Sequence, residues 1–324
     1  MNLRASVVIP TFRRAALLQR CLLAVLRQRL PPSAYEIIVC DDAASEATRR
    51  QVEALADRHP GGPALRYVAV RGTRGPAGAR NAGWQSARAP VIAFTDDDTI
   101  ADPDWLAEGL AALDPGTDAV AGTIDVPLGP RPTDYERDQA GLARAEFATA
   151  NCFVRRDALQ RTGGFDPRYR MAWREDSDLH FALLEAGCAV RRAPRARVLH
   201  PVRPAPFAAG LRMQKKIVFD TLLYGKYPRL YRERVRRGPP WFYLAVTLAL
   251  AAAAGLALVG LWRPAGAAVL AWLALTLWFF GRRLRAVSRA PAHVAELLLT
   301  SCLIPPLSIA WRLVGAWRFG PRLP

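Results

Sequence analysis

The first two hundred residues alternate between short apolar runs and stretches with a single apolar face. Mostly apolar runs of strand length, each ending abruptly in polar residues, lie at 6–10, 36–40, 65–70 and 90–95. Between the first two runs, Leu18, Leu22 and Val25 recur at the three- or four-residue spacing of a helix that packs by one side. Because strands alternate with helices, the pattern predicts an α/β fold whose mostly parallel sheet is flanked by helices.

The same alternation continues to about residue 200. Further strands are predicted at 119–122, 147–154 and 196–199, and helices at 46–58 and 102–113. Another helix is predicted to open near Glu175 and to end before Gly187. Residues 125–145 are polar and without periodicity, so we expect a flexible loop there.

Three consecutive carboxylates, Asp96, Asp97 and Asp98, directly follow one of the predicted strands. Side chains alternate in extended chain, so Asp96 and Asp98 should point to one side and Asp97 to the other. Two carboxylates at a strand end suit Mg²⁺ or Mn²⁺, and Mg²⁺ commonly adds phosphate oxygens of a substrate. The hypothesis is a metal–diphosphate site. The alternative is a solvated acidic turn before a helix, with Asp102 as N-cap and Pro103 in the first position.

Other charged residues are expected at the same edge of the sheet. In parallel α/β sheets, ligands bind outside the carboxyl ends of the strands. Asp41 and Asp42 follow the second strand, and Arg80 follows a glycine-rich basic loop. We therefore expect these three residues to lie with Asp96 and Asp98.

Three more positions have both a structural and a chemical interpretation. Glu175 and Asp176 stand where a helix begins, so each is either a capping residue or a general base kept ionised by the helix dipole. His200 follows an arginine-rich strand. A lone histidine is more often structural, but this one is close enough in the predicted fold to reach a metal ion.

Residues 203–324 differ in composition from the rest. They hold 18 basic and 3 acidic residues, hence +15 of the total charge of +17. Apolar runs at about 241–262 and 265–281 are of bilayer-spanning length and are flanked by basic clusters, which predicts a hairpin with both ends cytoplasmic. A third apolar segment, 292–317, contains Glu296 and two prolines, and either spans the membrane or lies in its interface.

These features predict three parts: an α/β catalytic domain at 1–202, a basic amphipathic linker at 203–240 and a membrane region at 241–324. Anionic lipid is the expected partner of the basic region, and nucleic acid is not, because the charge lies beside the bilayer-length apolar runs. The expected location is the inner (cytoplasmic) membrane, with the catalytic domain in the cytoplasm.

Taken together, the motifs resemble those of the family-2 inverting glycosyltransferases with the GT-A fold, a Rossmann-related α/β architecture. The resemblance covers about residues 4–200 and rests on the order and spacing of short motifs. In chain order these are residues 7–14 (VVIPTFRR), 36–42 (EIIVCDD), 78–83 (GARNAG), the triplet 96–98, residues 163–166 (GGFD) and the pair 175–176.

The resemblance implies roles for individual residues. Thr11 and Arg13 would line the nucleotide pocket, and Asp41 or Asp42 would hold the base or ribose. Arg80 would contact the pyrophosphate or nucleotide, and Glu175 would contribute to substrate binding. Asp96 and Asp98 would anchor the metal ion and ribose, with Asp98 the nearer metal ligand and His200 a weaker candidate. Asp176 would be the catalytic base.

Two departures from the family pattern bear on function. Where the family often has Asp-Asp-Gly-Ser, this chain has Ala43 and Ala44 after the two aspartates, so its nucleotide contacts are expected to differ. The Gln-x-x-Arg-Trp motif of processive polysaccharide synthases is absent from the sequence, which favours addition of a single sugar.

The predicted function is therefore metal-assisted transfer of one sugar, with inversion, from a nucleotide-sugar donor to an acceptor hydroxyl, plausibly on a lipid-linked or cell-envelope glycan. One alternative is a sugar-phosphate nucleotidyltransferase. It is disfavoured because that class has a glycine-rich first loop, whereas this first strand runs into Pro10, Thr11 and Phe12. The other is a non-catalytic membrane scaffold in which the acidic triplet only caps a helix.

Overall fold

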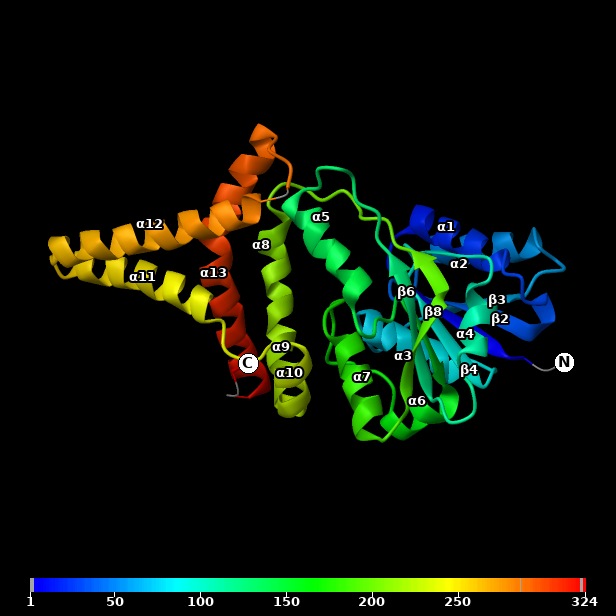
Figure 1. Ribbon diagram of the computed structural model, residues 1–324. Coiled ribbons are helices and arrows are strands. Elements are labelled where there is room, and N and C mark those ends of the chain that lie inside the picture. The colour runs from blue at the N-terminus through cyan, green and yellow to red at the C-terminus, as the bar shows by residue number, and fades with distance from the viewer. Residues whose placement is uncertain (1–2, 286, 321–322) are drawn as a thin grey trace. The chain divides into compact units, whose positions relative to one another are not determined.

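The computed structural model describes residues 3–285, 287–320 and 323–324. The chain forms two compact units, each described separately here (Figure 1). We call Met1–Pro127 with Gly141–Pro201 the sheet unit, and Leu128–Ala140 with Val202–Pro324 the helical unit. The segment predicted as a linker, 203–240, belongs to the helical unit, and the three-part functional division stays a prediction.

The sheet unit is built on one mixed sheet, which in the described residues has eight strands in the order β3-β2-β1-β4-β7-β6-β8-β5. Strands β3, β2, β1 and β4 run parallel, β7 is antiparallel to both of its neighbours, and β6 is parallel to β8. The predicted α/β class is confirmed. The strand bounds are β1 Ala5–Thr11, β2 Tyr35–Asp41, β3 Ala64–Ala69, β4 Val91–Thr95, β5 Ile100–Ala101, β6 Ala119–Asp125, β7 Asn151–Arg155 and β8 Val190–Leu199.

Continuous apolar runs mark the central strands. Every residue of β1, β2 and β4 is buried, as expected for strands covered on both faces. Trp105 and Phe153 are fully buried in the core beside the sheet, with ring centroids 5.1 Å apart. The helices of the sheet unit are α1 Ala15–Leu26, α2 Glu46–Asp57, α3 Pro76–Ser86, α4 Trp105–Ala111, α6 Arg156–Thr162 and α7 Glu175–Glu185, with 3₁₀ turns η1 Pro32–Ala34 and η2 Ala140–Arg144, the latter starting in the helical unit.

The prediction that Asp102 caps a helix is wrong. Helix α4 begins at Trp105, with Asp104 in the N-cap position. Asp102 is still tied to the sheet, because its backbone N–H donates to the carbonyl of Arg197 in β8 at 3.0 Å. Pro103 and Asp104 then form a turn, so the helix starts later than predicted.

Among its described residues, the helical unit contains three helices that are long and apolar enough to cross a membrane by length and composition: α11, α12 and α13 (Figure 1). They overlap the segments predicted at 241–262, 265–281 and 292–317. The unit comprises α5 Asp134–Gln139, α8 Ala209–Met213, η3 Gln214–Ile217, α9 Val218–Lys226, α10 Pro228–Arg234, α11 Trp241–Leu258, α12 Trp262–Leu284 and α13 Pro291–Phe319.

The expectation of an irregular loop at 125–145 is wrong. Residues 128–140 include α5, which opens with a reciprocal capping box between Thr133 and Glu136. The segment is tied into the helical unit: Asp134 pairs with Arg283 of α12 at 2.7 Å, and its backbone N–H donates to His293 Nε2 at 3.0 Å. A short polar helix of this kind has little hydrophobic periodicity, so the capping box is its main sequence signal.

Candidate active site

The acidic triplet is divided as predicted, with Asp97 apart from Asp96 and Asp98, but it lies in a turn after β4 and not in extended chain. The Asp97 carboxylate is 2% exposed and accepts hydrogen bonds from Thr11 Oγ1 at 2.7 Å and from Arg14 Nη1 at 3.0 Å. Burial raises the pKa of Asp97, against the opposing effects of these two partners. Asp96 and Asp98 face the other way.

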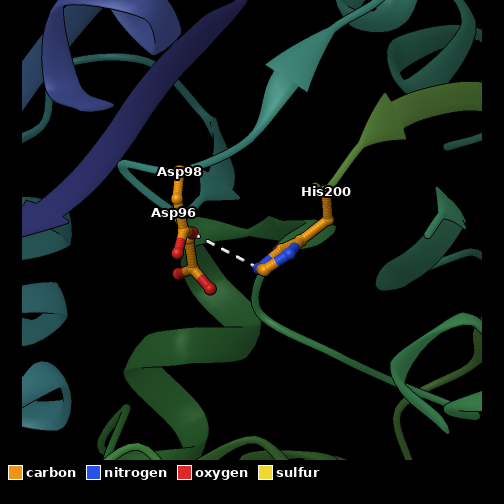
Figure 2. A group of neighbouring side chains, drawn as sticks. All are labelled: Asp96, Asp98 and His200. Carbon is orange, nitrogen blue, oxygen red and sulfur yellow. Dashed lines mark ion pairs between the residues drawn. The ribbon is translucent and has the colours of Figure 1, made fainter. Parts of the chain in front are cut away.

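Asp96, Asp98 and His200 converge at the ends of two strands (Figure 2). One ligand atom from each lies within 4.8 Å of the others, and His200 Nε2 is 3.3 Å from Asp98 Oδ1. His200 reaches this point because it follows β8 directly and its backbone N–H donates to Asp125 of β6 at 2.8 Å. Burial alone would lower the pKa of His200, but the hydrogen bond to Asp98 and the nearby negative charges raise it.

This donor set fits a divalent cation. Two carboxylates supply the oxygen ligands that Mg²⁺ and Mn²⁺ prefer, and an imidazole nitrogen adds a ligand more typical of transition metals. The hydrogen bond to Asp98 favours the protonated form of His200, so a cation bound by this nitrogen would compete with the imidazole proton.

Arg80 links the metal-ligand candidate Asp96 to the start of α7. Its guanidinium is 2% exposed and pairs with Asp96 at 2.7 Å and with Glu175 at 3.1 Å. The Phe165 ring lies 5.7 Å from the guanidinium carbon. Arg80 was predicted to contact a pyrophosphate directly. In this structure its guanidinium already pairs with two carboxylates, so it links the Asp96 side of the site to the Glu175 side.

The predicted base, Asp176, is the second residue of α7. Arg174, in the N-cap position, has left-handed backbone with φ 74°, an uncommon conformation for a residue with a side chain, and it turns the chain sharply into the helix. The pKa of Asp176 is raised because surrounding protein atoms desolvate its carboxylate, although solvent still reaches part of it. The backbone N–H of Ser177 donates to one Asp176 oxygen at 2.7 Å.

Glu175 is more deeply buried than its neighbour. Desolvation raises the pKa of Glu175 to about 7, against the lowering effect of the Arg80 charge. Its Oε2 atom is buried without a hydrogen-bond partner among the described residues. A buried carboxyl of this kind is neutral or charged according to what binds beside it.

The two aspartates after β2 have different surroundings. Asp41 is fully buried and accepts hydrogen bonds from the backbone of Ala43 and Ser45 and from the Tyr67 hydroxyl, at 2.9, 2.7 and 3.2 Å. It therefore closes the turn. Asp42 accepts one hydrogen bond from Gly75 N at 2.9 Å. Its other oxygen, Oδ1, is buried without a partner among the described residues, so this atom can accept a hydrogen bond from a ligand.

Sequence reasoning assigned Arg13 to the site and missed Arg14. Arg13 has φ 54° and its guanidinium carbon lies 5.3 Å from the exposed Phe12 ring. Arg14 contacts the triplet, at 3.0 Å from Asp97 and 3.8 Å from Asp98. The sequence signal for Arg14 is that it lies three residues after Thr11, which also binds Asp97. The left-handed backbone of Arg13 separates the directions of the two arginines.

Comparison with known proteins finds matches among glycosyltransferases. Residues 6–178 match the sequence profile described as glycosyl transferase family 2. The chain is 27% identical over 211 residues to glycosyltransferase AglE of Haloferax volcanii, a match covering 61% of this chain and 67% of that protein. It is 30% identical over 105 residues to WfgD of Escherichia coli, described as a UDP-Glc:alpha-D-GlcNAc-diphosphoundecaprenol beta-1,3-glucosyltransferase; that match covers 32% of this chain and 37% of WfgD.

Among solved structures, the chain is similar to the mannosyltransferase PcManGT from Pyrobaculum calidifontis, in complex with GDP-Man and Mn²⁺. The TM-score is 0.58 at 21% sequence identity, covering 98% of this chain and 87% of the other. At this identity the likeness establishes a shared GT-A-like fold.

Proposed function

The chain belongs to glycosyl transferase family 2, and from that premise we propose that it transfers a single sugar, with inversion, from a nucleoside-diphosphate sugar to an acceptor hydroxyl. The observation that carries the proposal is the arrangement around Arg80. This one buried side chain connects the Asp96–Asp98–His200 cluster to the helix that begins with Glu175 and Asp176.

In this proposal Asp96, Asp98 and His200 hold Mn²⁺ or Mg²⁺. The bound cation would offset the negative charge that builds on the leaving diphosphate. Arg80 keeps the Asp96 carboxylate oriented through its 2.7 Å ion pair, and Arg14 adds positive charge 3.8 Å from Asp98. The structural neighbour solved with GDP-Man and Mn²⁺ supports this choice of donor class and metal.

Asp176 is the proposed general base. An acceptor hydroxyl must lose its proton as it attacks the anomeric carbon, on the face opposite the leaving diphosphate. The raised pKa of Asp176 makes its carboxylate a stronger proton acceptor than an ordinary aspartate. One base and one separate diphosphate site correspond to a single in-line displacement, which inverts the anomeric centre.

Asp42, with its free buried oxygen, is the proposed contact to the nucleotide. Asp41 and Thr11 support the pocket instead of lining it, since their polar atoms are engaged in the turn after β2 and with Asp97. Arg13, which is exposed next to Phe12, remains a candidate for donor contact.

We further propose that the acceptor is lipid-linked or part of a cell-envelope glycan, and that the helical unit attaches the enzyme to the cytoplasmic face of the inner membrane. Three helices of spanning length and the excess positive charge of residues 203–324 support attachment to an anionic membrane. WfgD, whose described acceptor is a diphosphoundecaprenol-linked sugar, supports the acceptor class.

A screen of nucleotide sugars tests the function. The full-length protein in membranes should hydrolyse one donor slowly in Mn²⁺ or Mg²⁺ and not in chelator, and mass spectrometry of extracted lipids should show a product heavier by one sugar. Asp98→Asn in the same membranes is the matched control and should give neither signal. Equal donor turnover by wild type and Asp98→Asn would contradict the proposal.

A further inference from the structure

Helix α13 has two opposite faces of different character. Leu299, Leu303, Val314 and Trp317 are exposed, and their separations of 4, 11 and 3 residues place them on one side of the helix. Trp317 is 88% exposed. The other side is a buried stripe that includes Leu297 and Gly315 together with the polar residues Ser301, Ser308 and Arg312.

The buried stripe packs against short helices that precede the hairpin. Gly315 of α13 lies so close to Thr221 of α9 that a β-carbon there would be 2.6 Å from the threonine hydroxyl. Arg312 pairs with Asp220 of α9 at 3.4 Å, and both side chains are almost fully buried. The Arg312 charge is therefore neutralised within the protein, on the buried side of α13. The opposite side of the helix exposes apolar side chains.

The short helices before the hairpin carry exposed charged side chains, which are costly to place in the hydrocarbon layer of a membrane. Helix α10 follows α9 after a single residue and exposes Arg229 and Glu233, whose side chains are 85% and 54% accessible. Charged side chains exposed to acyl chains are costly, so α10 lies in water or among headgroups. Since α9 leads into α10, the part of α13 that packs on α9 should lie at a similar depth, in water or among the headgroups.

The hairpin α11–α12 has the opposite character. In the most apolar window of each of its helices, 11% of the residues are buried, against 39% for α13. Helices of 18 and 23 residues are about 27 and 35 Å long, which matches a hydrocarbon core of about 30 Å. The turn at its tip, near Leu258, is apolar and exposed.

Within the helical unit the two parts run in different directions. Figure 1 shows the hairpin projecting to one side, while α13, drawn in red, runs crosswise to it beside α8 and α9. At 29 residues α13 is about 44 Å long, longer than the hydrocarbon core. If the hairpin stands along the membrane normal, α13 lies close to the membrane plane.

We propose that α13 is a membrane-surface helix that buries its Leu299–Leu303–Val314–Trp317 face in the interface of the bilayer, and that only the α11–α12 hairpin crosses the membrane. The proposal rests on the membrane attachment proposed above. The occupant of the exposed face is the lipid interface, because basic residues border it at both ends: Arg289 precedes α13 and Arg318 closes it. The C-terminus then stays on the side of the membrane that carries the sheet unit.

Depth measurements on spin-labelled, full-length protein in vesicles containing anionic lipid test this orientation. In a Cys302→Ala background, we would label Leu303→Cys and Val314→Cys, 11 residues apart on the exposed face of α13. The matched control pair, Leu248→Cys and Leu258→Cys, is 10 residues apart on α11. Collision rates with oxygen and with a water-soluble nickel complex give the depth of each label.

The two positions on α13 should lie at similar depth, near the headgroups, while the two hairpin positions should differ by about 15 Å. A depth difference of that size between Leu303→Cys and Val314→Cys would overturn the proposal in favour of a third span. Spin–spin broadening with little access to oxygen at Leu303→Cys would also overturn it, because a second copy of the chain would then cover the face.

Chemical labelling from one side of sealed vesicles gives an independent test. Leu323→Cys should react with an impermeant maleimide from the same side as Arg50→Cys in the sheet unit, and Leu258→Cys from the opposite side. Reaction of Leu323→Cys together with Leu258→Cys would contradict the surface orientation. A protein found only in the soluble fraction would overturn this proposal and the proposed membrane attachment, while its metal-dependent donor hydrolysis would still test the glycosyl transfer separately.

Discussion

At the scale of single residues, neighbouring aspartates of one short motif have different environments. Asp97 is buried among Thr11 and Arg14, while Asp98 turns to His200. In the structure a turn brings this about: Asp97 and Asp98 lie in its middle and the Thr99 N–H donates to the Asp96 carbonyl at 3.2 Å, so the sequence predicted the division but not its cause.

The triplet therefore provides a matched pair of variants. Asp97→Ala should lower the free energy of unfolding by about 1–3 kcal/mol, because it leaves Thr11 and Arg14 without their buried acceptor. Asp98→Asn should abolish metal-dependent turnover because it removes a charged ligand, and should cost less stability than Asp97→Ala because the amide keeps the shape of the buried side chain. Chemical denaturation and donor hydrolysis with Mn²⁺ measure the two effects. The assignment fails if Asp98→Asn retains near-wild-type activity.

A second prediction at this scale concerns pH. The pKa of Glu175 is about 7 in the folded chain against an ordinary 4.5, because burial opposes ionisation. Between these values the unfolded chain has lost a proton that the folded chain keeps, so this group's contribution to stability falls as pH rises through that window. In the absence of divalent cations, Glu175→Gln should lack this part of the decline.

Melting temperatures of wild type and Glu175→Gln between pH 4.5 and 7.5 check the point, with Glu46→Gln on the exposed surface as control. Because carboxyls that do not interact with Glu175 contribute equally to both proteins, the difference between the two curves reports the titration of Glu175 together with its neighbour Asp176. A constant difference across the range would show that Glu175 titrates normally in the folded protein.

Some residue-level features could not be obtained from the sequence. Two adjacent arginines were equally plausible at the first turn, and the choice of Arg14 depends on the left-handed backbone of Arg13, which no local pattern indicates. Likewise Asp41 and Asp42 differ only because the turn after β2 closes on the first of them. Partners that lie far apart in the chain, such as Arg80 and Glu175, become neighbours only in the folded sheet.

At the scale of elements, strands and long helices were predictable from hydrophobic periodicity, and the exceptions are short or polar. Strand β7 is buried like the parallel strands β1, β2 and β4, so composition does not reveal that it runs antiparallel to its own neighbours. Helix α5 was missed because it has no buried residue to give a periodic pattern. Its capping box, Thr133 to Glu136, is a short-range sequence signal for a helix. The polar composition around it favours the prediction of a loop instead.

The α5 cap gives a prediction at this scale. Thr133→Ala removes the acceptor for the backbone N–H of Glu136 and should cost about 1 kcal/mol of local stability. Hydrogen exchange at residues 134–139 should then be several-fold faster, while exchange in β1 and β2 stays unchanged. Thr133→Ser, which keeps the hydroxyl, should restore protection. Equal exchange in all three proteins would show that the contacts of Asp134, and not the cap, hold the helix.

At the scale of the whole molecule, the sequence predicted an α/β part followed by apolar helices, but not that residues 128–140 join the latter. That segment lies between two strands of the sheet, and its partners Arg283 and His293 come about 150 residues later. The residue at which a truncated chain ends should therefore decide whether that chain is soluble or aggregates.

A chain ending at residue 202 should be more soluble than one ending at residue 237. The longer version retains α9, whose Val218, Leu222 and Leu223 are buried in the complete helical unit and would lose the cover of α13. Size-exclusion chromatography of both versions tests this. A monodisperse 1–237 chain beside an aggregated 1–202 chain would show that residues 203–237 instead complete the sheet unit's core.

The central claim is that donor binding and acceptor activation belong to separate residues, and turnover of Asp176→Asn at saturating donor tests it most directly. Because Asn keeps the shape of Asp176 and an oxygen that can accept from the Ser177 N–H, the variant should melt close to wild type and bind Mn²⁺ and donor with unchanged affinity. Its turnover should fall by about 10²–10⁴-fold, the usual loss for a positioned general base. Turnover close to wild type at full donor occupancy would remove Asp176 from the mechanism and contradict the account.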